Sequence, residues 1–225
     1  MKTAMILAAG RGERLKPLTN IIPKALCQVH NKPLIEYHVI KLARCGFERI
    51  VINHAYFGGQ IRRHLGNGKK WGVEICYSPE PPGGLETGGG IVNALPLLGK
   101  EPFMTINADI FTHYDFSTLN MADDALVKLV LTNNPQHNRQ GDFGLFNQQL
   151  TNERVYTYLG IACYHPEAFQ QSQAGRYSVT PLIRQLVKEN LAQGELFQGI
   201  WADIGSPERL SFANTLPDCL ELSTT

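Results

Sequence analysis

Short apolar runs alternate with amphipathic stretches along the 225-residue sequence, and this alternation limits the folds open to the chain. Each apolar run is long enough for a buried strand and too short to cross a bilayer. The amphipathic stretches between them have the spacing of surface helices. This order is typical of a mostly parallel sheet flanked by helices. We therefore expect a Rossmann-like α/β fold that forms one domain over residues 1–225.

The pattern also gives the approximate bounds of the elements. Strands are expected over residues 4–8, 49–53, 74–77, 103–107, 126–131 and 158–163. Helices are expected from residue 33 to about 46 and over 60–65, 87–95, 166–170, 181–189 and 207–216; prolines at first turns and glycines after last turns support several bounds. Residues 11–23 are expected to form a long ordered loop, and residues 133–157 a hairpin or lid over one end of the sheet.

Charge and cysteine usage narrow the class of protein. The net charge is +1, so no global field attracts nucleic acid or an anionic membrane, and neither partner is expected. The apolar start, residues 1–9, is too short for a signal peptide and charged residues follow it directly. The five cysteines are scattered without CxxC spacing, as expected for reduced thiols in the cytoplasm. The oligomeric state is not predicted.

The loop after the first expected strand has the composition of a phosphate site. Gly10 and Gly12 permit close approach of the backbone, and successive amides in such a turn form a concavity that binds anions. Four cations follow or flank the glycines: Arg11, Arg14, Lys16 and Lys24. The dinucleotide motif GxGxxG does not fit because Leu15 replaces its third glycine, and no segment fits the Walker A motif. The alternative is an exposed basic loop.

Two aspartates lie in or directly after apolar segments. Asp109 follows the apolar strand 103–107, and the carboxyl ends of strands are where open α/β sheets bind ligands. Asp203 lies in an apolar segment, Trp201-Ala202-Asp203-Ile204-Gly205. A magnesium ion needs only a few carboxylates in addition to water and phosphate oxygens. The alternative for each aspartate is capping of a helix or formation of a turn.

The segment Gly10-x-Gly12-x-Arg14-Leu15-x-Pro17-Leu18-Thr19, with Pro23-Lys24 downstream, closely resembles the signature loop of sugar-1-phosphate nucleotidylyltransferases. The resemblance implies a nucleotide-diphospho-sugar transferase fold and an enzyme that joins a nucleoside triphosphate to a sugar 1-phosphate. It implies Mg²⁺ held by Asp109 and Asp203, and catalytic roles for Arg14 and Lys24. The nucleotide-binding residues that it implies are Ala8, Ala9, Gly10, Arg11, Gly12, Glu13, Lys24, Thr87 and Gly88.

The same resemblance implies the remaining parts of the site. The glycine-rich segment Gly83-Gly84-Leu85-Glu86-Thr87-Gly88-Gly89-Gly90 corresponds to the wall of the nucleobase pocket, where glycines let the backbone approach a planar base. The alternative for it is a flexible turn before a helix. The implied sugar-binding residues are Asn107, Asp142, Glu153 and Gly160, and the residues around them form a small sugar-side hairpin or lid. Asp142 and Glu153 are equally compatible with a solvated lid.

Several further segments resemble one subgroup of the family, the N-acetylmuramate-1-phosphate uridylyltransferases. They include Pro33-Leu34-Ile35-Glu36-Tyr37-His38, Tyr77-Ser78-Pro79-Glu80 and Ala94-Leu95-Pro96-Leu97-Leu98-Gly99. The subgroup implies UTP as the nucleotide substrate and UDP-N-acetylmuramate, used in cell-wall recycling, as the product. Three alternatives remain open: mannose-1-phosphate guanylyl transfer, glucose-1-phosphate thymidylyl transfer, and a non-catalytic sensor of nucleotide sugars.

Overall fold

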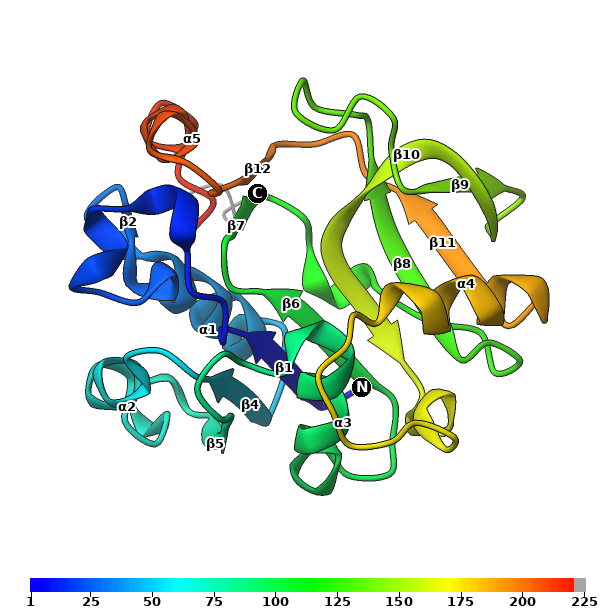
Figure 1. Cartoon of the computed structure of the whole chain (residues 1–225), viewed down its shortest axis with the longest axis horizontal. Coiled ribbons are helices and arrows are strands. Elements are labelled where there is room, and N and C mark those ends of the chain that lie inside the picture. The colour runs from blue at the N-terminus through cyan, green and yellow to red at the C-terminus, as the bar shows by residue number, and fades with distance from the viewer. Residues whose placement is uncertain (221–225) are drawn as a thin grey trace.

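The computed structural model of the chain describes residues 1–220, so the expected end of the domain at residue 225 lies outside the described residues. Its centre is an eight-stranded sheet with the order β11-β8-β10-β6-β1-β4-β5, to which β9 is added by pairing with β10 (Figure 1). The strands of this sheet are β1 (Thr3–Leu7), β4 (Arg49–His54), β5 (Glu74–Pro79), β6 (Phe103–Asn107), β8 (Val127–Thr132), β9 (Phe143–Phe146), β10 (Gln149–Tyr164) and β11 (Ala192–Leu196).

The sheet is mostly parallel, as predicted. β1 pairs in parallel with both β4 and β6, β4 pairs in parallel with β5, and β8 with β11. β10 is antiparallel to every strand it contacts. The expected strand over residues 158–163 is only the second half of β10, and β11 was not predicted because Ala192–Leu196 contains Gln, Gly and Glu and has no apolar run.

The helices cover both faces of the sheet. They are α1 (Leu34–Arg44), α2 (Gly58–Leu65), α3 (Glu86–Leu98), α4 (Thr180–Lys188) and α5 (Pro207–Ala213). Successive residues of β1 point to opposite faces: Ala4 and Ile6 pack in the cluster that includes α1 and α2, whereas Met5 packs in the cluster that includes α3 and α4. Figure 1 shows α3 and α4 in front of the sheet. The expected helix over 166–170 is a short 3₁₀ turn, Pro166–Phe169.

A small two-stranded sheet beside the main one joins distant parts of the chain. β12 (Trp201–Asp203) pairs antiparallel with β7 (Ile110–Thr112). A separate apolar cluster, which contains Leu15, Phe111 and Ile204, packs this sheet and α5 against the segment after β1. A second two-stranded sheet pairs β2 (Gln28–Val29) with β3 (Lys32–Pro33). The remaining 3₁₀ turns are Glu13–Leu15, Leu18–Asn20, Lys24–Leu26, Lys69–Trp71 and Phe116–Thr118.

The expected hairpin within residues 133–157 is present, and it extends the central sheet. β9 and β10 are joined by Asn147 and Gln148, whose φ angles of 47° and 65° are both left-handed. A two-residue type I′ hairpin turn requires a left-handed φ at both of its central residues, and its geometry matches the twist of the paired strands. Among the helices within residues 1–220, none is long and apolar enough to cross a membrane.

The Gln148→Gly variant should be more stable than the parent protein. A left-handed backbone costs an L-residue other than glycine roughly 1 kcal/mol, and glycine avoids most of this cost. The hydrogen bond from the Gly194 amide to the Gln148 carbonyl (2.8 Å) involves only the backbone and is retained. We expect the melting temperature to rise by about 2 °C. Gln149→Gly, at the first residue of β10, is the control and should lower it; a fall in both variants would contradict the prediction.

Candidate active site

The carboxyl ends of β1, β4 and β6 border a cavity that we call the main cavity because of its position at the end of the central strands. β1 lies between β4 and β6, so the order of the strands reverses at β1, and ligands of open α/β sheets bind at such a point. The cavity encloses about 490 Å³. The loop that follows β1 forms one wall, and the segment before α3 forms the opposite wall.

The loop after β1 is held in shape by its own contacts. Gly12 has a φ of 70°, and its carbonyl accepts hydrogen bonds from the Leu15 amide (3.0 Å) and the Thr19 hydroxyl (2.7 Å). The Arg11 guanidinium donates to the Thr19 carbonyl (2.6 Å) and lies over the Tyr56 ring at 5.1 Å from its centroid. Arg11 therefore braces the loop across the cavity rim and fixes the direction of the glycine amides.

A buried chain of hydrogen bonds connects the two walls. The Ala8 amide donates to Asn53 Oδ1 (2.8 Å), and Asn53 Nδ2 donates to Glu80 Oε1 (2.6 Å). The other oxygen of Glu80 accepts from the Leu85 amide (2.6 Å). Glu80 is only 9% exposed, so these partners replace the water that the carboxylate loses on burial. The loop after β1 and the segment before α3 are thereby fixed relative to each other.

Most of the residues predicted to bind nucleotide line this cavity. From the predicted set these are Ala8, Ala9, Gly10, Arg11, Gly12, Glu13, Lys24 and Thr87. Glu86, from the segment expected to form the wall of the base pocket, lines it as well; Asn53, Tyr56 and Arg176 also line it and were not predicted from the sequence. Lys24 forms an ion pair with Asp109, and both side chains are largely buried. On the rim, a hydrogen bond from Lys16 holds the pKa of Glu13 below its usual value, so this carboxylate is ionised near neutral pH.

The glycine run of α3 packs against another part of the chain. A Cβ at Gly88 would lie 2.6 Å from the Tyr177 ring, and one at Gly89 would lie 1.9 Å from the Gly175 carbonyl. A Cβ at Gly90 would lie 2.7 Å from Glu80 Oε1. The glycines were predicted to let the backbone approach a base, but at these three positions the group that comes close is another part of the protein. Within the glycine-rich segment 83–90, Gly83 and Gly84, with left-handed φ angles of 100° and 71°, line the cavity.

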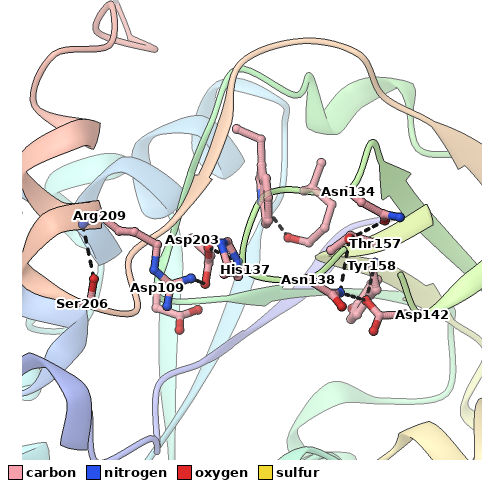
Figure 2. A network of polar contacts seen from close by, with 12 residues as sticks. Asp109, Asn134, His137, Asn138, Asp142, Thr157, Tyr158, Asp203, Ser206 and Arg209 are labelled. Carbon is pink, nitrogen blue, oxygen red and sulfur yellow. Dashed lines mark hydrogen bonds and ion pairs between the residues drawn. The ribbon is translucent and has the colours of Figure 1, made fainter. Parts of the chain in front are cut away.

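A smaller pocket of about 210 Å³ adjoins the main cavity. Asn107 and Asp109 line both spaces. Asp203 lines the smaller pocket together with Asp142, whose Oδ2 accepts from the Tyr158 amide (2.9 Å) and from Asn138 Nδ2 (3.1 Å). Figure 2 shows Asp109 and Asp203 near each other and the Asp142 group beside them. The Ile204 amide donates to the Asp109 carbonyl (2.7 Å), which explains how the two aspartates are brought together.

The donor set at this point fits a divalent cation such as Mg²⁺. Asp203 Oδ1 is buried and accepts no hydrogen bond, so one carboxylate oxygen is available as a ligand. Within residues 1–220, no three His, Cys, Asp or Glu side chains gather into a complete metal cage. Mg²⁺ does not need one, because it usually binds one or two carboxylates and completes its shell with water and substrate phosphates.

Four residues that were predicted to belong to the site line neither pocket. Gly88 is buried in α3 and outside the cavity lining. Arg14 is exposed and directs its guanidinium towards Gly205. Glu153 is exposed on β10 and lines neither pocket. Gly160 has a φ of 95°, and a Cβ there would lie 2.8 Å from Asn107 Nδ2, so it leaves room for that side chain.

Sequence reasoning missed the two side chains that contact Asp203. Arg209 forms an ion pair with Asp203 Oδ2, and His137 Nε2 lies 2.9 Å from Oδ1 (Figure 2). His137 comes from the loop before β9, and no local pattern connects that loop to residue 203. Arg209 had a weak signal: it is in the first turn of the predicted helix at 207–216, shortly after Asp203.

Comparisons with known proteins agree on one family. The chain matches the family model described as nucleotidyl transferase over residues 3–216. It is 44% identical to the N-acetylmuramate alpha-1-phosphate uridylyltransferase of Neisseria meningitidis serogroup B, over 95% of this chain and 97% of the relative. A protein of the same description from Caulobacter vibrioides is 31% identical over 92% and 93% of the two chains. The fold matches a structure described as a glucose-1-phosphate thymidylyltransferase of Bacillus anthracis, with a TM-score of 0.84, 22% identity and coverage of 95% and 94%.

Alanine should destabilise the protein at Gly12 and not at Gly10, because only Gly12 is in a crowded, left-handed position. A Cβ at Gly12 would lie 2.9 Å from Thr19 Cγ2 at a left-handed φ, whereas a Cβ at Gly10 meets nothing within 4 Å. We expect Gly12→Ala to lower the free energy of unfolding by about 1–3 kcal/mol. Gly10→Ala should change it by less than about 0.5 kcal/mol. Urea denaturation measures both, and equal losses would contradict this account.

Proposed function

The chain belongs to the nucleotidyl transferase family, and from this premise we propose that it transfers a uridylyl group from UTP to N-acetyl-α-muramate 1-phosphate. The products are UDP-N-acetylmuramate and pyrophosphate. The substrates are proposed from the relative that is 44% identical over nearly the full length of both chains. A role in cell-wall recycling and a location in the cytoplasm, where UTP is available, are parts of the same proposal.

The observation that carries the proposed chemistry is the shared wall between the two pockets. Asp109 and Asn107 line both the main cavity and the smaller pocket. A nucleotide in the first and a sugar phosphate in the second would meet beside Asp109 and its partner Lys24. Transfer between two bound substrates requires such an arrangement, because their alignment replaces a bimolecular encounter.

On the nucleotide side, the backbone amides of residues 9–13 are proposed to bind the β- and γ-phosphates. Arg14 is proposed to bind the same phosphates from outside, which would require its guanidinium to turn from Gly205 towards the cavity. Lys24 would offset the charge that develops on the α-phosphate as the bond to the pyrophosphate oxygen breaks. Thr87 lines the cavity, and Gly88 follows it in the first turn of α3; both were assigned to the base and keep that assignment as a proposal.

On the sugar side, the phosphate oxygen of the acceptor is already ionised and needs no general base. It attacks the α-phosphorus, and the bridging oxygen leaves with pyrophosphate. Asp109 and Asp203 would hold a divalent cation, proposed to be Mg²⁺, which when bound supplies charge neutralisation between the reacting phosphates. Asn107 and Asp142, which line the smaller pocket, are proposed to orient the sugar. Gly160 would act by leaving space for Asn107, and Glu153 would need to move towards the pocket.

Substrate specificity tests the proposal directly. Release of pyrophosphate should be fastest with UTP and N-acetyl-α-muramate 1-phosphate when four nucleoside triphosphates are each combined with several sugar 1-phosphates. Activity confined to GTP with mannose 1-phosphate, or to dTTP with glucose 1-phosphate, would refute the proposed substrates. Binding of UTP without release of pyrophosphate from any pair would indicate a non-catalytic sensor.

Lys24→Ala should lower turnover by on the order of a hundredfold or more, because one charge contact to the transition state is lost. Circular dichroism should show an unchanged fold. Lys2→Ala is the control: Lys2 is exposed, pairs with the exposed Glu48 and lines neither the main cavity nor the smaller pocket, so turnover should change less than about threefold. Near-normal turnover of Lys24→Ala would exclude the proposed role.

A further inference from the structure

Asp203 is held unequally at its two oxygens. Arg209 pairs with Oδ2, and the two side chains are only 19% and 23% exposed. Oδ1 is buried and accepts no hydrogen bond; His137 Nε2 is 2.9 Å away but outside hydrogen-bonding geometry. A carboxylate can rotate to exchange its oxygens, so a partner on one oxygen determines which oxygen faces the pocket. Figure 2 shows Arg209 approaching Asp203 from α5.

We propose that Arg209 is a positioning residue, which binds Asp203 Oδ2 and thereby presents Oδ1 to the divalent cation of the reaction. This inference rests on the proposed function for the identity of the reaction. Partners that orient a metal ligand from behind typically change the affinity for the ion by 10–100-fold. Because Arg209 is on Oδ2 and His137 faces Oδ1, an ion at Oδ1 would leave the Arg209 pair in place and replace the contact with His137.

The residues between Asp203 and Arg209 shape this contact. A Cβ at Gly205 would lie 2.0 Å from Arg209 Nη2 and 3.0 Å from Arg14 Nη2. The guanidinium therefore reaches Asp203 across a position that has no side chain. The Ser206 hydroxyl caps α5 by accepting from the Arg209 amide (3.4 Å), which fixes where the side chain leaves the helix. The segment from residue 203 to 209 thus contains both the proposed metal ligand, Asp203, and the residue that positions it, Arg209.

Two effects of Arg209 on the ion have opposite signs. Its positive charge repels a cation and reduces the attraction of Asp203 for it. Its contact fixes the orientation of the carboxylate and spares the ion the cost of ordering it. The pair is largely buried, where a carboxylate without a partner is costly to maintain. We expect orientation to dominate, so loss of Arg209 should weaken ion binding. The opposite sign would mean that repulsion dominates.

The test measures the ion separately from turnover. Binding of Mn²⁺ to the full chain with UTP and without sugar phosphate is followed by electron paramagnetic resonance. Arg209→Met, which keeps the length of the side chain and removes its charge, should weaken Mn²⁺ binding 10–100-fold. Arg209→Lys should recover part of the loss. Gly205→Ala should reproduce the defect although Arg209 is retained. Arg49→Met, in an exposed ion pair at the start of β4, is the control and should bind Mn²⁺ as the parent does.

Unchanged or tighter Mn²⁺ binding by Arg209→Met would overturn the inference. A normal Mn²⁺ affinity of Arg209→Met together with a raised KM for UTP at saturating Mg²⁺ would also overturn it. That result would mean that Arg209 contacts the phosphates of UTP. A lower melting temperature with unchanged ion binding would show a structural role only, and would also overturn it. If the parent binds Mn²⁺ and UTP but transfers to no sugar phosphate, the proposed function fails, and the binding data still decide the role of Arg209.

Discussion

The buried hydrogen bonds through Asn53 and Glu80 are the constraint on which the main cavity depends. They connect the end of β1, the end of β4 and the start of α3, three segments that are far apart in the sequence. Glycine at position 90 leaves the space that the Glu80 carboxylate occupies, since a Cβ there would lie 2.7 Å from Glu80 Oε1. A buried carboxylate with each oxygen paired specifies one arrangement of its donors. The cavity is therefore formed by the fold before any ligand arrives.

Charge is balanced locally around the two aspartates. Lys24 pairs with Asp109, and Arg209 pairs with Asp203, so neither carboxylate is buried without a cation. This pairing offsets the repulsion between two acids that line one pocket. Arg11 and Arg176 add positive charge to the lining of the main cavity, whereas Arg14 is exposed and directs its guanidinium towards Gly205. An overall charge of +1 conceals this local separation of charge.

The sequence was most informative where a feature is local. The α/β alternation predicted the parallel core, and the glycines and cations after β1 predicted a loop that does line the cavity. Glycine spacing alone did not show that Gly88 and Gly89 pack against the chain at 175–177, because that contact depends on tertiary structure. His137 and Arg209 were missed for the same reason. The placement of Asp109 and Asp203 on one pocket was expected, whereas their roles remain predictions.

The pairing of β12 with β7 has a consequence for biosynthesis. Asp109 belongs to the first half of the chain, and its partner acid arrives only with the strand that pairs beside it near the end of translation. Until the C-terminal segment is synthesised, Leu15 in the segment after β1 also lacks Ala202 and Ile204 of its apolar cluster. The order of synthesis thus leaves the smaller pocket without Asp203 until β12 pairs with β7.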